Sequence, residues 1–340
     1  MKLFYISKNY SDRFTASSKA KYDCECIMNS LGFYNIGLPI SFIKSSYLGR
    51  LRTFLSNKCA YLKMPQNSIA CLQYPVFDYK NQVQRCIRNK NRIITIIHDL
   101  NFLRGINENS DLEVLNKSDV LIVHTNRMKE WCLSNLSVKH IVVLNIFDYL
   151  YDNNNKPSFL RDNVKKDSIA FAGNLGKSAF LDLIHFDTVK LNLYGIGAEK
   201  RSLGESCIYR GCYPPDELYK HLDSMFGLVW DGKSTDTCTG NTGEYLKYIA
   251  PHKISMYLSC GIPVIVWSKS AMADFVKKEQ VGLVIDSINE LEDIIKNIST
   301  DDYEAMCKKV SIIQKNIITG YYLSKALKEA FSCLGNKWIM

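Results

Sequence analysis

The chain has 340 residues and carries 43 Lys and Arg against 34 Asp and Glu, which gives a formal net charge of +9. This length suggests about two domains, and 46% apolar with 23% charged residues is typical of a globular protein rather than a disordered one. No apolar run approaches the ~18 residues that a membrane span needs, and the apolar stretch at the N-terminus is too short for a secretory signal.

The excess positive charge lies in the first half of the chain. Residues 1–150 carry 20 Lys and Arg against 11 Asp and Glu, whereas residues 151–340 carry 23 of each. Such an asymmetry indicates that one domain meets something anionic, which leaves nucleic acid, a membrane surface and phosphate groups as classes of partner.

The 12 cysteines form no Cys-x-x-Cys pair, which argues against a zinc site or thioredoxin-type chemistry. Many of them stand inside apolar segments, as Cys260 does in SMYLSCGIPVIV. This pattern favours reduced, buried thiols in a cytoplasmic protein.

Short apolar runs without alternation, separated by helix-like sequence, predict parallel strands that are buried on both faces. In the first half these runs lie at residues 2–7, 68–75, 92–99, 119–125 and 140–147. The segment 126–136 is long enough for a crossover helix. We therefore expect an N-terminal Rossmann-like domain over residues 1–150.

A polar segment with three consecutive asparagines and a proline predicts an interdomain linker over residues 151–167. Beyond it we expect strands at 168–175, 190–195, 226–232, 263–267 and 281–286, and helices at 214–222, 252–260, 270–279, 288–297 and much of 301–335. The C-terminal domain is expected over 168–340, with its last helix as a candidate to return to the first domain. The predicted fold class is α/β, with two doubly wound domains whose ligands bind at the strands' carboxyl ends, in the cleft between the domains.

The densest chemical signal is the segment 226–267. A predicted strand ends at Trp230-Asp231-Gly232, and Pro251-His252-Lys253 then opens a helix. A helix N-terminus attracts phosphate, and Lys253 adds a full positive charge there. The alternative is a solvated first-turn lysine. Because a cation is mildly unfavourable at that position, its presence is some evidence for an anionic ligand.

Two predicted turns carry weaker signals. Gly173-Asn174 lies in the turn after the apolar residues SIAF (168–171), and its small residues let backbone approach a ligand whose phosphate Lys177 could reach. Gly195 ends the strand at 190–195, and Tyr213, further along, could stack on a base. The alternatives are ordinary turns and, for Tyr213, a hydrophobic staple before the helix at 214–222.

In the first domain, Asp99 follows the apolar run 92–97 and is a candidate general base for a hydroxyl acceptor, or else a cap of the next turn. Thr15 and Ser17 lie in a hydroxyl-rich loop after the first strand, where they could cap a helix, donate to phosphate or do both. The sequence holds no Asp-x-Asp, so a strand-end metal site is not supported, and no cofactor is expected. Without GxGxxG after the first strand, a dinucleotide oxidoreductase is not favoured.

Several segments together resemble one family: FGLVWDG, GEYLKY-x-x-PHK, S-x-YLS-x-x-x-PV-x-x-W, A-x-ADF, IIHD, IFDYL and AGNL. Over nearly the whole chain they resemble the bacterial β-1,6-galactofuranosyltransferases of polysaccharide assembly. The chain is more distantly similar to the streptococcal glucosyltransferase that extends glycans on serine-rich adhesins. The resemblance implies a GT-B architecture and metal-independent, inverting transfer from UDP-galactofuranose to a glycoside.

The resemblance also implies the site. Its contacts to uridine diphosphate fall on Ser17 or Thr15, on Lys177, on Tyr213 and on the helix start formed by Pro251, His252, Lys253, Ile254, Ser255 and Met256. The general base is not fixed by it. Asp99 is the preferred candidate, with Asp231 and Glu244 as rivals.

The expected partners are a UDP-sugar donor, which is a substrate, and a glycoside or lipid-linked oligosaccharide acceptor. The basic residues of the first half suit an anionic membrane surface at the cytoplasmic face, nucleic acid is not an expected partner, and a homo-oligomer stays open. Two alternatives remain: a glucosyl- or N-acetylhexosaminyltransferase that acts on a glycopeptide, and a non-catalytic partner that binds an anionic ligand.

Overall fold

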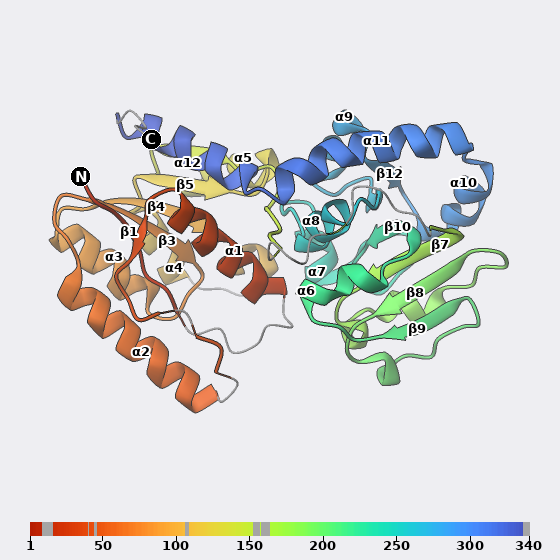
Figure 1. Cartoon of the computed structure of the whole chain (residues 1–340), viewed down its shortest axis with the longest axis horizontal. Coiled ribbons are helices and arrows are strands. Elements are labelled where there is room, and N and C mark those ends of the chain that lie inside the picture. The colour runs from red at the N-terminus through yellow and green to blue at the C-terminus, as the bar shows by residue number, and fades with distance from the viewer. Residues whose placement is uncertain are drawn as a thin grey trace. The chain divides into compact units, whose positions relative to one another are not determined.

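The computed structural model describes residues 1–8, 16–39, 41–43, 46–105, 109–151, 157 and 164–335. The chain divides into two compact units. Unit 1 comprises residues 1–148 and 320–340, and unit 2 comprises residues 149–319. Figure 1 shows both, with the colour running from red at the N-terminus to blue at the C-terminus.

Unit 1 contains a six-stranded sheet with the order β2-β1-β3-β4-β5-β6, in which all neighbouring strands are parallel. Its strands are β1 (Leu3–Tyr5), β2 (Tyr34–Asn35), β3 (Ile69–Tyr74), β4 (Arg92–Ile97), β5 (Val120–Val123) and β6 (His140–Val143). Strands β3 and β5 are buried along their whole length, as expected for a parallel sheet covered on both faces.

The helices of unit 1 are α1 (Ala16–Ser30), α2 (Ser46–Lys63), α3 (Tyr79–Arg88), α4 (Asn109–Leu115), α5 (Asn126–Asn135) and, from the end of the chain, α12 (Tyr321–Cys333). Helix α12 contacts β5, β6 and α1, and Figure 1 shows it in dark blue beside β5. Asp148 accepts hydrogen bonds from Tyr322 N (3.1 Å) and Leu323 N (2.8 Å) and so caps α12.

Unit 2 contains a second parallel six-stranded sheet, with the order β12-β11-β10-β7-β8-β9. Its strands are β7 (Lys165–Ala172), β8 (Lys190–Tyr194), β9 (Cys207–Gly211), β10 (Ser224–Val229), β11 (Val264–Trp267) and β12 (Gly282–Ile285). Its helices are α6 (Pro215–Leu218), α7 (Gly240–Tyr245), α8 (His252–Ser259), α9 (Ala273–Glu279), α10 (Leu291–Asn297) and α11 (Thr300–Ile317). Apolar side chains of the central strands, including Phe171, Phe226 and Ile265, form its core.

The domain boundaries differ from the expected ones. Strand β7 begins at Lys165, three residues inside the segment 151–167 that we expected as a linker. The expected helical segment 301–335 is two helices, α11 and α12. The candidate return of the last helix to the first domain is confirmed, because residues 320–340 belong to unit 1. Gly320 separates them with φ +76°, and a Cβ there would lie 2.8 Å from Ile27 Cγ1, so only glycine fits this junction without a shift of its neighbours.

Two strands were not predicted. Strand β2 has two residues and β9 is only partly buried, and both lie at an edge of a sheet. Strand β2 is too short and β9 too exposed to produce the continuous apolar run on which the prediction of the other ten strands depended.

Candidate functional site

A buried tyrosine, Tyr257, joins helix α8 to two strands of the sheet of unit 2. The Tyr257 ring packs on Gly227 of β10, where a Cβ would lie only 2.3 Å from a ring carbon. Its Oη accepts a hydrogen bond from Ala172 N (2.8 Å) and donates one to Ala170 O (3.2 Å). These contacts hold α8 against the carboxyl end of β7. In doubly wound folds ligands bind at this end of the strands.

Lys253, in the first turn of α8, lies against the turn that follows β7. Its ammonium is 4.3 Å from the centroid of the Phe171 ring, and its Cε is 3.0 Å from the position that a Cβ on Gly173 would occupy. Burial lowers the pKa of Lys253, while Asp231 and Cys238 oppose this shift. Among the described residues no carboxylate lies within salt-bridge distance of this ammonium. The arrangement leaves a partly desolvated cation that an anionic ligand would neutralise.

Ser255 lies one residue beyond the first turn of α8. It is buried, and within the described part of the chain its Oγ has no hydrogen-bond partner. A buried unpaired hydroxyl costs about 1–3 kcal/mol, which a ligand oxygen would recover. We call the first turn of α8, Lys253, Ser255 and Gly173 the phosphate site.

The other predicted residues of α8 have different environments. Ile254 and Met256 are buried apolar side chains, so they can contribute only their backbone to a ligand. Pro251 stands at the N-cap, where its carbonyl accepts from Ile254 N (2.9 Å). The His252 ring lies 5.0 Å from the Tyr149 ring.

The ends of β7 and β8 run closely together beside the phosphate site. Gly173 N donates to Tyr194 O (2.9 Å), and Leu175 N donates to Ile196 O (2.9 Å). A Cβ on Gly195 would lie 1.8 Å from Gly173 O, so this crossing requires glycine. The same turn carries Asn174 and Lys177, both with exposed side chains. The structure therefore brings Lys253 to Gly173, while Lys177 stays on the surface of the turn.

Tyr213 is stacked on a histidine. Its ring centroid lies 3.6 Å from that of His221 with an interplanar angle of 12°, and its Oη donates to Arg210 O (3.0 Å). Helix α6 begins directly after it. Its stacking partner is thus His221 rather than a staple residue within α6.

The two rival carboxylates in unit 2 differ in position. Asp231 follows β10, accepts a hydrogen bond from Gly232 N (3.2 Å) and acts electrostatically on Lys253. Glu244 is exposed on α7 and forms an ion pair with Lys247. Only Asp231 is therefore coupled to the phosphate site.

Asp99 lies at the carboxyl end of β4 in unit 1, where we expected it. Its Oδ2 is 3.6 Å from Arg104 Nη1, and its charge acts on Lys21 of α1. Lys21 Nζ donates to Pro75 O (2.6 Å). Burial and the nearby Lys8 lower the pKa of Lys21 to about 7, against the opposite influence of Asp99.

A buried polar chain at the same end of this sheet escaped prediction. Ser7 Oγ donates to Glu25 Oε2 (2.6 Å), and Gln73 Nε2 donates to Glu25 Oε1 (3.4 Å). Gln73 Oε1 in turn forms a hydrogen bond with His98 Nε2 (2.7 Å). The His98 ring stacks on Phe147 with centroids 5.3 Å apart. The chain fixes the backbone that carries Asp99. Its sequence signal is weak, because Glu25 stands in α1 among other charged residues, Lys21 and Asp23.

Thr15 lies outside the residues that the structure describes, and of Ser17 only the backbone, in the first turn of α1, is described. Over the described ranges, no group of three or more His, Cys, Asp or Glu side chains is placed to hold a metal ion. No helix in the described part of the chain is long and apolar enough to cross a membrane.

Comparison with known proteins matches each half of the chain to a family model. The model "Glucosyltransferase 3-like, N-terminal domain" matches residues 4–146, and "Glucosyltransferase 3-like, C-terminal domain" matches residues 169–330. The chain is 33% identical to the β-1,6-galactofuranosyltransferase WbbI of Escherichia coli, over 72% of this chain and 73% of that protein. It is 28% identical to glucosyltransferase 3 of Streptococcus gordonii, over 70% of each.

Solved structures share the fold at low identity. Sucrose-phosphate synthase from Thermosynechococcus elongatus has a TM-score of 0.61 at 11% identity, covering 99% of this chain and 100% of that one. HepE of Anabaena in complex with UDP has a TM-score of 0.61 at 12% identity and the same coverage. This chain therefore has the GT-B fold and is a glycosyltransferase that belongs to the glucosyltransferase 3-like family.

Proposed function

We propose that this glycosyltransferase moves galactofuranose from UDP-galactofuranose to a hydroxyl group of a glycoside, with inversion at the anomeric carbon and without a metal ion. The relative with 33% identity is named for β-1,6-galactofuranosyl transfer, which supports this donor and linkage class. The observation that carries the proposal is the phosphate site, where a partly desolvated Lys253 meets Gly173 at the start of α8.

The departing nucleotide diphosphate develops negative charge as the glycosidic bond breaks. The free N–H groups of α8 and the Lys253 ammonium are preorganised cations and dipoles that would stabilise this charge. The Ser255 hydroxyl would donate to a phosphate oxygen. Lys177 would contact the same diphosphate from the turn after β7, and Tyr213 would face the uracil ring.

The acceptor hydroxyl must lose a proton as it attacks the anomeric carbon. We assign this proton to Asp99, because its carboxylate ends a strand and the polar chain through His98 fixes its backbone. Inversion follows from a single displacement with no covalent sugar intermediate. The acceptor would be a sugar of a growing surface polysaccharide, free or lipid-linked.

A second candidate is glucosyl or N-acetylhexosaminyl transfer to a glycopeptide. The 28% identity to glucosyltransferase 3 of Streptococcus gordonii favours it. The two candidates share the diphosphate chemistry and differ only in the sugar and the acceptor.

The test of stereochemistry and metal dependence is transfer from UDP-galactofuranose to alkyl α-glucosides, with and without EDTA. The proposal expects a β-galactofuranoside, identified by the coupling of its anomeric proton in the NMR spectrum, at equal rates in both arms. An α-linked product would contradict inversion. A rate that EDTA abolishes and added divalent cation restores would contradict the metal-independent mechanism.

A further inference from the structure

Helix α2 exposes an apolar face. Leu62 is 89% exposed and Tyr47 is 75% exposed, and the other large apolar side chains on this face are also open to solvent: Leu48, Leu51, Phe54 and Leu55. Their spacing of three, four and seven residues places them on one side of the helix. A contiguous apolar surface of this kind marks a site of interaction.

The opposite face of α2, which packs on unit 1, is small and polar. Its buried residues are Gly49, Thr53, Ser56, Asn57 and Ala60. Ser56 Oγ donates to Ser7 O (2.8 Å) and accepts from Leu38 N (2.9 Å), while Asn57 Oδ1 accepts from Gln82 Nε2 (3.1 Å). Hydrogen bonds therefore attach α2 to its unit, and the apolar side chains are not required for that packing.

A groove of about 350 Å³ runs beside this face, between α2 and α3. Aromatic and basic side chains line it, chiefly Phe54, Tyr61, Phe77, Lys58, Arg85 and Arg88. The Arg85 guanidinium lies 5.4 Å from the Tyr61 ring, and Lys58 Nζ lies 5.1 Å from the Phe54 ring. One carboxylate, Asp78, is also present and accepts a hydrogen bond from Tyr61 Oη (2.7 Å). Figure 1 shows α2 in orange at the border of unit 1, next to α3.

The positive charge of α2 and of unit 1 indicates an anionic partner for this face. Helix α2 has no Asp or Glu, and unit 1 carries 23 Lys and Arg against 12 Asp and Glu. A second copy that pairs through the same face would bring two α2 helices together whose charged side chains are all basic, which like-charge repulsion disfavours. An anionic bilayer offers phosphates for the basic side chains and an acyl boundary for the apolar ones.

We propose that the exposed face of α2 docks this enzyme onto an anionic membrane, with Tyr47, Leu55 and Leu62 inserted at the headgroup boundary and Lys58, Arg85 and Arg88 against lipid phosphates. This surface uses no residue of the donor site, so the inference goes beyond the proposed transfer reaction. It also gives the positive charge of unit 1 a function.

The test is sedimentation of the full chain with vesicles made of equal parts phosphatidylglycerol and phosphatidylcholine. The triple variant Leu48→Ser, Leu55→Ser, Leu62→Ser should lower the partition coefficient at least about tenfold, because it removes inserted apolar area. Lys58→Gln and Arg88→Gln should each lower it about fivefold, and binding should weaken as salt rises. The matched control is Ile312→Ser on α11, which removes an apolar side chain that is 57% exposed but lies in unit 2, and it should bind as the unaltered chain does.

Equal binding by the unaltered chain and the triple variant would overturn the proposal. Equal binding to pure phosphatidylcholine would overturn its electrostatic part. A concentration-dependent dimer that the triple variant abolishes, without vesicle binding, would show that a second copy occupies the face. Circular dichroism checks that the variants fold, and transfer to a water-soluble glucoside separates this surface from the donor site, because the triple variant should keep that activity.

Discussion

Lys253 is the residue on which the proposed donor chemistry depends most. A lysine in the first turn of a helix opposes the helix dipole, and burial against Gly173 adds a desolvation cost. A bound diphosphate would offset both the unfavourable helix dipole and the desolvation cost. The sequence predicted this residue because Pro251 and Lys253 mark a helix start after a buried strand, which is a local signal.

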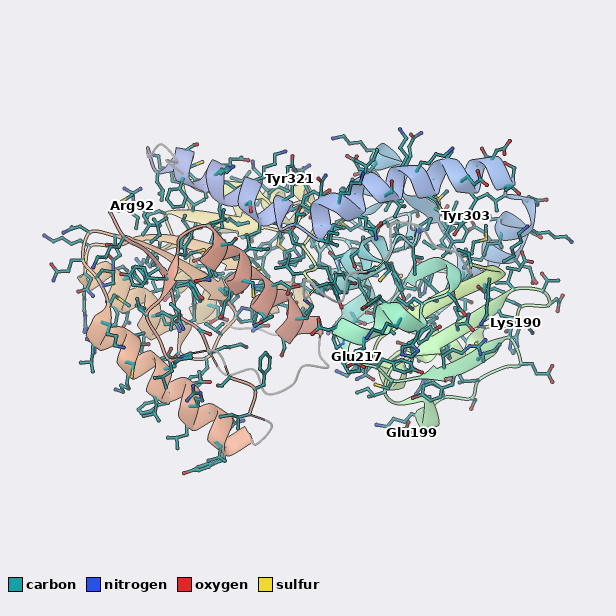
Figure 2. All side chains as sticks on the ribbon, viewed as in Figure 1. Arg92, Lys190, Glu199, Glu217, Tyr303 and Tyr321 are labelled. Atoms are coloured by element: carbon teal, nitrogen blue, oxygen red, sulfur yellow. The ribbon has the colours of Figure 1, made fainter. Side chains whose placement is uncertain are left out.

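Replacing Lys253 by alanine should weaken UDP binding by about 10- to 100-fold, the value of one charge-assisted hydrogen bond. The UDP affinity of Lys253→Arg should lie between those of the unaltered chain and of Lys253→Ala, because arginine keeps the charge but has little room beside Gly173. Calorimetric titration with UDP measures the affinity. Lys190→Ala is the control, because this exposed lysine begins β8, at the other end of the strand from the site (Figure 2). Unchanged affinity in Lys253→Ala would remove the phosphate site from the account.

Kinetic measurements on three variants distinguish Asp99 from Asp231 and Glu244 as the general base. Asp99→Asn should reduce kcat about 10²- to 10⁴-fold with UDP affinity retained, the usual effect of losing a general base. Asp231→Asn should change UDP affinity rather than kcat, because Asp231 acts electrostatically on Lys253. Glu244→Gln should change little, since Glu244 pairs with Lys247 on the surface. A large loss of kcat in Asp231→Asn alone would transfer the role of base to Asp231.

Burial raises the pKa of Asp148 to about 7, although the N–H groups of Leu323 and Tyr322 lower it. The folded chain therefore holds a proton between about pH 4 and 7 that the unfolded chain releases, so this group's contribution to the free energy of unfolding falls as pH rises through that window. The free energy of unfolding of the unaltered chain should exceed that of Asp148→Asn by more at pH 5 than at pH 8. Urea titrations at the two pH values measure it, and a difference that grows with pH would refute the assignment.

At the scale of elements, the hydrogen bonds of Tyr257 join α8 to β7. Tyr257→Phe leaves Ala172 N–H without its acceptor and should lower the free energy of unfolding by about 1–3 kcal/mol. UDP affinity should fall as well, because the helix start is no longer fixed to β7. The control is Tyr303→Phe, which removes a hydrogen bond to Met225 O (3.0 Å) from α11 (Figure 2) and should lower stability without an effect on UDP. Equal UDP affinity in both variants would show that α8 needs no such anchor.

The central strands and most helices could be predicted because each carries its own apolar pattern. The edge strands β2 and β9 could not, since they are short or half-exposed. The polar chain through Glu25 was also beyond prediction: its members lie 18 to 48 residues apart, and no local pattern joins them. The outward apolar face of α2 likewise appears only once the buried side of that helix is known.

At the scale of the whole molecule, the two units divide the charge unequally. With α12 included, unit 1 carries 23 Lys and Arg against 12 Asp and Glu, whereas unit 2 carries 20 against 22. The phosphate site belongs to unit 2, so the donor does not account for the positive charge. The charge is concentrated on the unit that carries α2 and Asp99, which fits an acceptor presented at an anionic surface.

The identity of the donor sugar separates galactofuranosyl transfer from the second candidate activity, and competition between donors decides between them. The protein is given an equimolar mixture of UDP-galactofuranose, UDP-galactopyranose, UDP-glucose and UDP-N-acetylglucosamine with one alkyl glucoside, and the products are resolved by mass and linkage analysis. We expect a galactofuranosyl product in large excess over every other. A glucosyl, galactopyranosyl or N-acetylglucosaminyl product as the main species would contradict it.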